Sequence, residues 1–148
     1  MMEFKKHIHY DTDLEDAVLG ICMFEKTAFS RIHGIIRKEV FYKTGNQIVF
    51  EAMNKMWEEN LPIDILTVVN FIVRGGNETL ENWNTDYFVA RLTNSVVSSA
   101  HLEYHSLILR QLFAERELLR IKYSPDADGD VLERAKKIQD EIQNLFTI

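Results

Sequence analysis

The chain has 148 residues, 46% of them hydrophobic and 27% charged, which is the balance of a soluble globular protein. Its formal net charge of -6 excludes a strongly basic nucleic-acid binder, because affinity for phosphates rests largely on clustered lysine and arginine. Cys22 is the single cysteine, the opening MMEFKKHIHY lacks the apolar core of a signal peptide, and no apolar run reaches the roughly 18 residues of a membrane span. We therefore expect one cytoplasmic domain with no membrane partner.

The first segments of the chain have the spacing of amphipathic helices. Residues 12–15 (TDLE) have the form of a capping box, and an apolar stripe at helical spacing follows them to Cys22. A second stripe runs from Phe29 to Ile36 and predicts a helix starting near Thr27. Residues 44–47 (TGNQ) repeat the capping-box form and open a third predicted helix, which ends before Pro62.

The next segments continue the helical pattern. Asp64 is positioned to cap a short helix that Gly75 and Gly76 stop, and after a polar loop a further helix is predicted near Asp86. No segment alternates polar and apolar residues for long enough to predict a sheet. The side chains predicted to form one buried core are Leu14, Val18, Ile21, Phe29, Ile32, Phe41, Phe50, Met53, Trp57, Val68 and Ile72.

The last third of the chain predicts a helical hairpin. No proline or glycine interrupts residues 99–123, which predicts one helix about 37 Å long. A second helix after Asp130 carries apolar residues spaced four, three, four and three, which is a short heptad seam. Two such helices joined by a polar loop predict an antiparallel pair. The predicted organisation is all-α: a flexible segment over 1–11, a compact globule of about five to six helices over 12–97, and a long antiparallel helical hairpin over 98–148.

The stretch SPDADGD, residues 124–130, raises the choice between a calcium site and a tight acidic turn. A helix–loop–helix calcium site needs glycine at position 6 and glutamate at position 12. Starting from Asp126, these positions hold Val131 and Lys137, and placing Gly129 at position 6 puts Ala135 at position 12. The sequence therefore favours a turn that joins the two helices of the hairpin.

Other residues with chemical potential do not form a recognisable site. His101 and His105 share a helix face but have no acidic or thiol partner at characteristic spacing. Cys22 lies on an apolar stripe and is interpreted as a core residue, and RGGNET (74–79) lacks the lysine of a phosphate-binding loop. We therefore predict no catalytic, cofactor or metal site in this chain.

Five short motifs together resemble a known family. They are Glu15 with AVLG (17–20), FY (41–42), IVFEA (48–52), PIDILTV (62–68) and AHLEY (100–104). In this order and spacing they are similar to the N-terminal domain of the bacterial replicative DNA helicase, the DnaB family, over residues 12 to 123.

The resemblance implies a role in assembly rather than in catalysis. In that family the domain is a helical globule plus a hairpin, and hairpins pair so that six copies form a collar on a ring of motor domains. The expected partners are therefore further copies of the chain (a dimer, or a hexamer in the full protein), primase, and in some systems a helicase loader. ATP and magnesium belong to the motor domain, which lies outside this sequence, and DNA is expected to bind weakly or indirectly.

The predicted partner-binding surface follows from the hairpin, because two helices can hide only one stripe each against one another. The residues assigned to this surface are Tyr104, Leu107, Leu112, Leu118, Leu119, Ile121, Ile138, Ile142 and Leu145. Two other classes of protein remain open: a helix-turn-helix DNA-binding regulator, and a small all-helical enzyme with a dispersed site.

Overall fold

The computed structural model of the protein describes residues 9–75, 84–95, 98–122, 133 and 136–141. Within these ranges the regular structure is entirely helical, as the sequence predicts, and contains no strand. In chain order the α-helices are α1 (Thr12–Phe24), α2 (Ala28–Ile32), α3 (Thr44–Glu58), α4 (Ile65–Arg74), α6 (Thr85–Leu92) and α7 (Leu102–Lys122). Two 3-10 turns, η2 (Lys38–Val40) and η3 (Thr93–Ser95), and the helical residues 136–141 complete the set.

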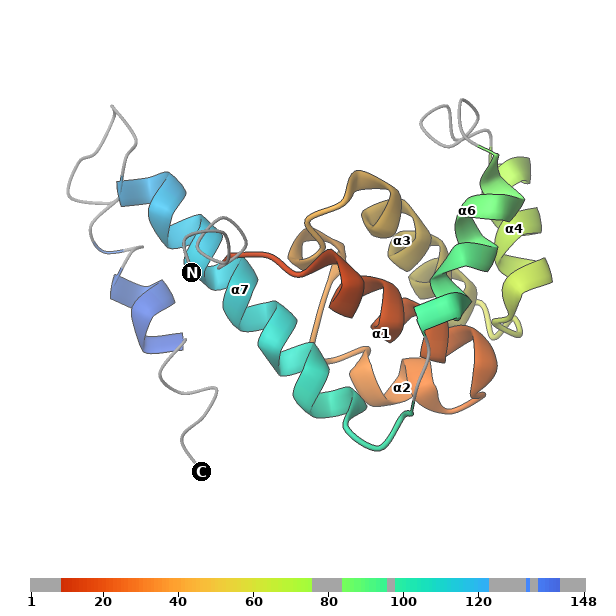
Figure 1. The fold of residues 1–148 in the computed structure, drawn as a ribbon, viewed down its shortest axis with the longest axis horizontal. Coiled ribbons are helices and arrows are strands. Elements are labelled where there is room, and N and C mark those ends of the chain that lie inside the picture. The colour runs from red at the N-terminus through yellow and green to blue at the C-terminus, as the bar shows by residue number, and fades with distance from the viewer. Residues whose placement is uncertain (1–8, 76–83, 96–97, 123–132, 134–135, 142–148) are drawn as a thin grey trace.

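The helices form a globule from which one long helix projects (Figure 1). Helices α1, α2, α3, α4 and α6 pack together, with α4 beside α6 at the far end of the globule. Helix α7 packs on α1, α2 and η2 with its first part and extends beyond the globule with its last part. No described helix is long and apolar enough to cross a membrane.

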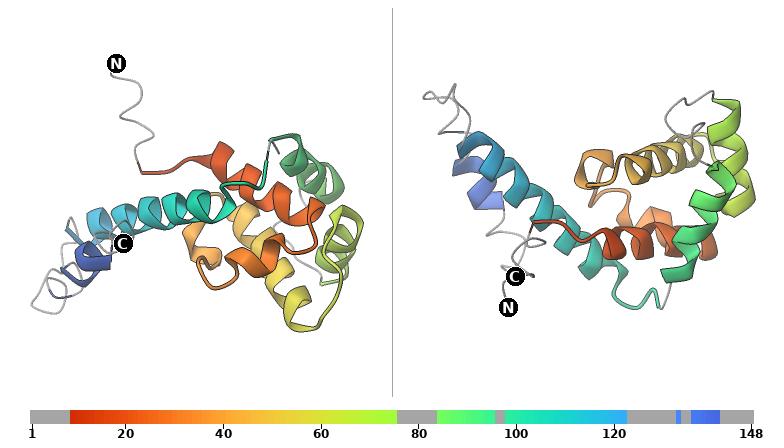
Figure 2. Two further views of the ribbon diagram at one scale, coloured as in Figure 1. Left: turned by 90° about the horizontal axis from the view of Figure 1, so that it is seen from below. Right: turned by 45° about the horizontal axis from the view of Figure 1, so that its top comes forward.

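Residues 136–141 lie beside the projecting part of α7, which supports the predicted hairpin (Figure 2). Glu141 forms an ion pair of 3.2 Å with Arg110, and Ile138 lines the same groove as Phe113 and Glu117. The later residue of the second segment thus meets the earlier residue of α7, which is the antiparallel order. The predicted acidic turn, residues 124–130, lies outside the described residues.

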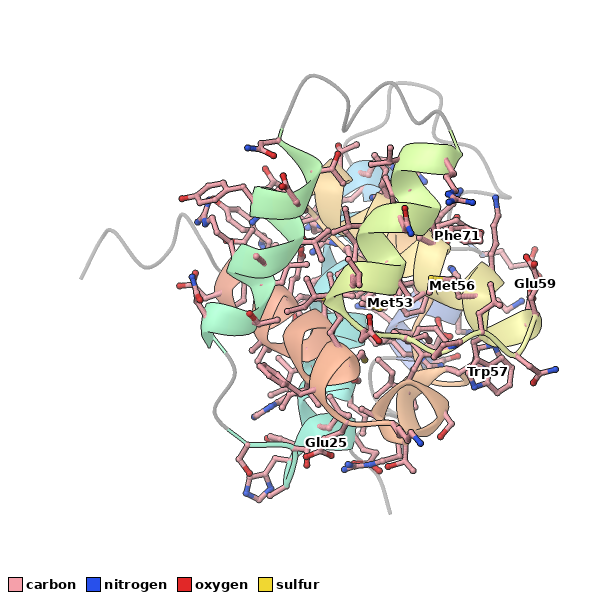
Figure 3. The ribbon with its side chains drawn as sticks, turned by 90° about the vertical axis from the view of Figure 1, so that its right-hand side faces the viewer. Glu25, Met53, Met56, Trp57, Glu59 and Phe71 are labelled. Atoms are coloured by element: carbon pink, nitrogen blue, oxygen red, sulfur yellow. The ribbon has the colours of Figure 1, made fainter. Side chains whose placement is uncertain are left out.

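The core of the globule follows the predicted stripes with two exceptions. Nine of the predicted core residues are buried: Val18, Ile21, Phe29, Ile32, Phe41, Phe50, Met53, Val68 and Ile72. Leu14 is only partly buried and packs against their edge. Trp57 was predicted to be buried, and this is wrong: its side chain is 39% exposed at the last turn of α3, where its ring stacks on His33 at 4.0 Å (Figure 3).

Two predicted helix starts are also wrong in detail. The cap of α1 is Asp11, whose carboxylate accepts a hydrogen bond from the N–H of Leu14 at 3.0 Å, one residue before the predicted Thr12. The N-cap of α3 is Lys43, which makes no side-chain capping bond, and Thr44 is already helical. The predicted cap at Asp64 is confirmed, with Thr67 completing a capping box.

Helix α2 is shorter than the apolar stripe predicts. It ends at Ile32, and the chain turns through Gly34, a residue with low helix propensity, before Ile36 enters the core. The apolar spacing was therefore correct about burial and wrong about helix length. This turn brings residues 33–40 against α7.

Candidate functional site

Helix α7 carries most of the predicted partner-binding residues, and its first half is anchored in the core. Leu102 and Leu109 are 1% exposed and belong to the core cluster, and Phe113 packs against it. Ser106 is fully buried between the two leucines, and its hydroxyl has no hydrogen-bond partner among the described residues. The first two turns of α7 are thus part of the globule.

A bidentate ion pair holds the start of α7 to α2. The guanidinium of Arg31 donates to the two carboxylate oxygens of Glu103 at 2.9 and 2.6 Å, and also to the carbonyl of Ser99 at 2.9 Å. The hydrogen bond from Arg31 lowers the pKa of Glu103 to about 2, and the same bond raises the pKa of Arg31. Both side chains remain partly in solvent, so salt screens this pair.

A second arginine holds the middle of α7. Arg116 donates to the carbonyl oxygens of His9 at 2.7 Å and Val40 at 2.8 Å. Its guanidinium lies over the rings of Tyr42 and Phe113, at 5.5 and 5.7 Å from their centroids. Burial lowers the pKa of Arg116, and the nearby Glu15 carboxylate partly offsets this effect.

Glu15, a residue of the first resembling motif, is a buried acceptor in the globule. It is 1% exposed and accepts from the backbone N–H groups of Tyr42 at 2.6 Å and Lys43 at 3.3 Å and from the Asn46 side chain at 3.1 Å. Burial raises its pKa, while these hydrogen bonds and the Arg116 charge lower it in part. Glu15 therefore supplies from α1 the acceptor that the N-terminus of α3 lacks locally.

The structure places the predicted partner-binding residues in three environments. Tyr104 is 54% exposed, whereas Ile121 is 3% exposed and already buried within a single chain. Intermediate burial is shared by Leu107, Leu112, Leu118, Leu119 and Ile138. Ile142 and Leu145 lie outside the described residues. The assignment of these residues to a partner surface remains a prediction.

A groove of about 390 Å³ separates the globule from the hairpin. The segment from His33 to Val40 forms one wall, and α7 with Ile138 and Glu141 forms the other. Its charged residues include both signs, among them the ion pair of Arg110 with Glu141. The groove therefore has no net charge preference that would define a ligand.

The remaining candidate residues form no reactive centre in the described part of the chain. The rings of His101 and His105 are 6.2 Å apart, and no group of three or more metal-ligating side chains is found among the described residues. Cys22 is 1% exposed, and burial raises the pKa of its thiol to about 12, which confirms it as a core residue. RGGNET lies mostly outside the described residues.

His9 and Tyr10, near the end of the segment 1–11 that is predicted to be flexible, make contacts with distant parts of the chain, and the flexibility of that segment stays a prediction. His9 contacts Glu115 at 3.2 Å, and the ring of Tyr10 stacks on Tyr42 at 4.2 Å. Sequence reasoning missed these contacts and also Arg31 and Arg116. Periodicity reports which residues face the core, and it carries no signal for an arginine that reaches carbonyl groups far along the chain.

The comparisons with known proteins agree with this architecture. The family model described as the DnaB-like helicase N terminal domain matches residues 7–111. The replicative DNA helicase DnaB of Rhodothermus marinus is 31% identical over 140 residues, which cover 92% of this chain and 15% of the relative. The replicative DNA helicase DnaB of Geobacillus stearothermophilus is 28% identical over 117 residues, covering 79% of this chain and 25% of the relative. The chain thus spans only a small part of these relatives.

A solved structure shares the fold. The crystal structure of the N-terminal domain of DnaB helicase from Mycobacterium tuberculosis matches with a TM-score of 0.68 at 22% identity, covering 88% of this chain and 96% of that chain. The all-helical globule, the projecting α7 and the match of the family model over residues 7–111 lead to one assignment. The chain belongs to the DnaB-like helicase N-terminal domain family.

Proposed function

We propose that this chain is the assembly and docking module of a replicative DNA helicase and has no catalytic activity of its own. The family match and the names of the relatives support the helicase context. The sequence contains no G-x-x-x-x-G-K loop, so ATP and magnesium would be used by a separate motor domain. The role left to the chain is to bring copies and partners together.

The observation that carries the proposal is the apolar surface on the projecting part of α7. Leu118 and Leu119 are only partly buried, although residues 136–141 already lie along this helix. Burying apolar area is worth about 25 cal/mol per Å², so a second copy that covers this surface would be stabilised. We propose that hairpins pair in this way, as a dimer or within a hexamer.

A second exposed apolar surface lies at the opposite end of the molecule. Leu66 is 76% exposed and Val73 is 55% exposed, and their spacing of seven places them on one side of α4. Tyr87, on the neighbouring α6, is 62% exposed. Because α4 and α6 lie away from the hairpin (Figure 1), this surface would stay open for primase or a loader when copies pair.

Sedimentation and binding measurements on two matched variants test both surfaces. Leu118→Glu should weaken self-association, because burying an unpaired carboxylate costs several kcal/mol. Leu66→Glu makes the same change on α4 and should leave self-association intact while weakening binding of the primase from the same organism. Both variants should keep the helical circular dichroism of the unchanged chain.

Two outcomes would contradict the proposal. If the unchanged chain is monomeric at about 100 µM, the proposal of hairpin pairing is wrong, because even a weak interface would be detected by sedimentation at that concentration. Equal effects of the two variants on self-association would show that the effect is not specific to α7.

A further inference from the structure

A row of aromatic rings and guanidinium groups crosses the place where α7 leaves the globule. Tyr10 stacks on Tyr42 with centroids 4.2 Å apart and planes 6° apart. The guanidinium of Arg116 lies over both Tyr42 and Phe113, 5.5 and 5.7 Å from their ring centroids. Arg37 lies 5.5 Å from the centroid of Phe113. The residues of this Arg116 ladder are, in order, Tyr10, Tyr42, Arg116, Phe113 and Arg37.

The ladder joins four separate segments of the chain. Arg37 directly precedes η2, Tyr42 lies between η2 and α3, and Phe113 and Arg116 belong to α7. Tyr10 comes from the segment before α1. Cation–π and stacking contacts of this kind are each favourable, so the row as a whole resists separation of these segments.

Arg116 also donates two hydrogen bonds to backbone carbonyl groups. Its two terminal nitrogens donate to two different carbonyl oxygens, one in the N-terminal segment (His9) and one in η2 (Val40). The planar guanidinium can donate from two separated nitrogens while it lies over aromatic rings, whereas a compact ammonium group has no flat surface to stack on a ring. Arg116 therefore fixes the position of α7 against both segments at once.

The N-terminal segment contacts α7 as a strap. His9 accepts from Arg116 through its carbonyl and contacts Glu115 through its ring at 3.2 Å. The next residue, Tyr10, closes the ladder on Tyr42. Two successive residues thus bind one turn of α7 and the segment beneath it.

The position of the ladder along α7 allows it to affect the direction of this helix relative to the globule. Leu102 and Leu109 hold the first part of the helix in the core. Arg116 lies seven residues beyond Leu109, or about 10 Å along the axis at 1.5 Å per residue. A helix that is attached to the globule only through its first turns can change direction about that attachment, whereas a second fixed point further along sets its direction. We propose that the Arg116 ladder is this second fixed point, that it sets the direction of the hairpin relative to the globule, and that residues 9–10 are the strap that completes it.

The inference concerns one chain and does not rest on pairing of hairpins. It is tested by a distance within a single chain, measured by double electron–electron resonance. Spin labels are placed on exposed cysteines introduced at Asn70 of α4 and Lys122 at the end of α7. Labelled chains are diluted with unlabelled chains so that only distances within one chain are recorded. The native Cys22 is buried, and its pKa of about 12 keeps it unreactive at neutral pH.

The unchanged chain should give a single narrow distance. Arg116→Ala, Arg116→Lys and Tyr10→Ala should each lose that single narrow distance, while Tyr10→Phe, which keeps the ring, should retain it. The matched control is Arg120→Ala: it lies one turn further along α7, and its recorded ion pair is to Glu117 of the same helix. This control should also retain the narrow distance.

Folding of each variant is checked by thermal unfolding. If Arg116→Ala does not fold, the distances measured in Arg116→Lys and Tyr10→Ala test the proposal instead. A narrow and unchanged distance in folded Arg116→Lys would overturn the role of the ladder, and the same result in Tyr10→Ala would overturn the strap. Loss of the narrow distance in Arg120→Ala would also overturn the proposal, because the effect would then follow any change of charge on α7.

Discussion

Among the described residues, the carboxylate of Glu15 accepts hydrogen bonds from three donors: the backbone N–H groups of Tyr42 and Lys43 and the side-chain amide of Asn46. A neutral glutamine would place an NH₂ group where one carboxylate oxygen now accepts. At least one buried N–H would then face another donor. A buried donor without an acceptor costs about 1–3 kcal/mol.

We therefore predict that Glu15→Gln lowers the free energy of unfolding by about 1–3 kcal/mol in urea denaturation at pH 7. The control is Glu58→Gln, an exposed change in the last turn of α3, which should alter stability by less than about 0.5 kcal/mol. Equal stability of the two variants would show that the contacts of Glu15 do not contribute.

The pH dependence of Glu15 has a definite sign. Burial raises its pKa in the folded state, so the folded protein binds this proton more tightly than the unfolded chain. Its contribution is fully present below the ordinary pKa near 4.5 and is lost as pH rises through the raised value. The free energy of unfolding of the unchanged chain, measured in a series of unfolding curves at different pH values, should show this decrease. The free energy of unfolding of Glu15→Gln should not show it.

At the scale of helices, the sequence predicted type and order better than ends. Apolar spacing located α1, α3, α4 and the long α7, because burial of one face imposes that spacing on any helix. The predicted start of α1 was wrong by one residue because Asp11, directly before Thr12, accepts from the N–H of Leu14. The predicted cap of α3 was wrong because Thr44 is already helical and Lys43 is the N-cap, and the distant Glu15 accepts from the N–H groups of Tyr42 and Lys43.

The contacts that hold α7 could not have been predicted in the same way. Arg31 reaches Glu103 across 72 positions, and Arg116 reaches His9 across 107. Neither arginine interrupts an apolar stripe or belongs to a recognised motif. Trp57 shows a different kind of error. It lies on the apolar stripe of α3, but it is exposed because α3 ends at the next residue, Glu58.

The apolar stripes that were correct allow a test of packing. Phe50 is 3% exposed in α3, and its ring lies 5.4 Å from that of Phe29 and 5.3 Å from that of Phe41. Phe50→Ala should therefore lower the free energy of unfolding by about 2–5 kcal/mol through lost burial and a cavity.

Phe24→Ala is the matched control, because Phe24 is 63% exposed at the end of α1. It should cost less than about 1 kcal/mol, since little apolar area leaves the core. A similar loss in both variants would mean that the faces of α1 and α3 are assigned wrongly.

At the scale of the whole molecule, the two proposed functions lie at opposite ends. The hairpin lies at one end and the exposed side chains of α4 and α6 at the other (Figure 1). The globule between them connects these surfaces through α7, whose direction the Arg116 ladder would set. A change in that direction would move the hairpin relative to the proposed docking surface without altering either surface.

The charges of the whole molecule bear on DNA. The net charge is -6, and several basic side chains are already engaged by acids. The recorded ion pairs include Arg31 with Glu103, Lys38 with Glu51, Lys43 with Asp16, Arg110 with Glu141 and Arg120 with Glu117. A cation that is paired with a carboxylate displaces few counterions from a phosphate chain, and counterion release is the main source of such affinity.

We therefore predict that the chain binds single- and double-stranded DNA with a Kd weaker than about 100 µM at 150 mM salt. Fluorescence anisotropy with labelled oligonucleotides over a salt series measures both the Kd and the slope of log K against log salt. The slope should be shallow, because it scales with the number of phosphates neutralised. Submicromolar binding with a steep slope would instead support a DNA-binding regulator, and a domain that binds DNA in this way would not need the helicase ring to reach it.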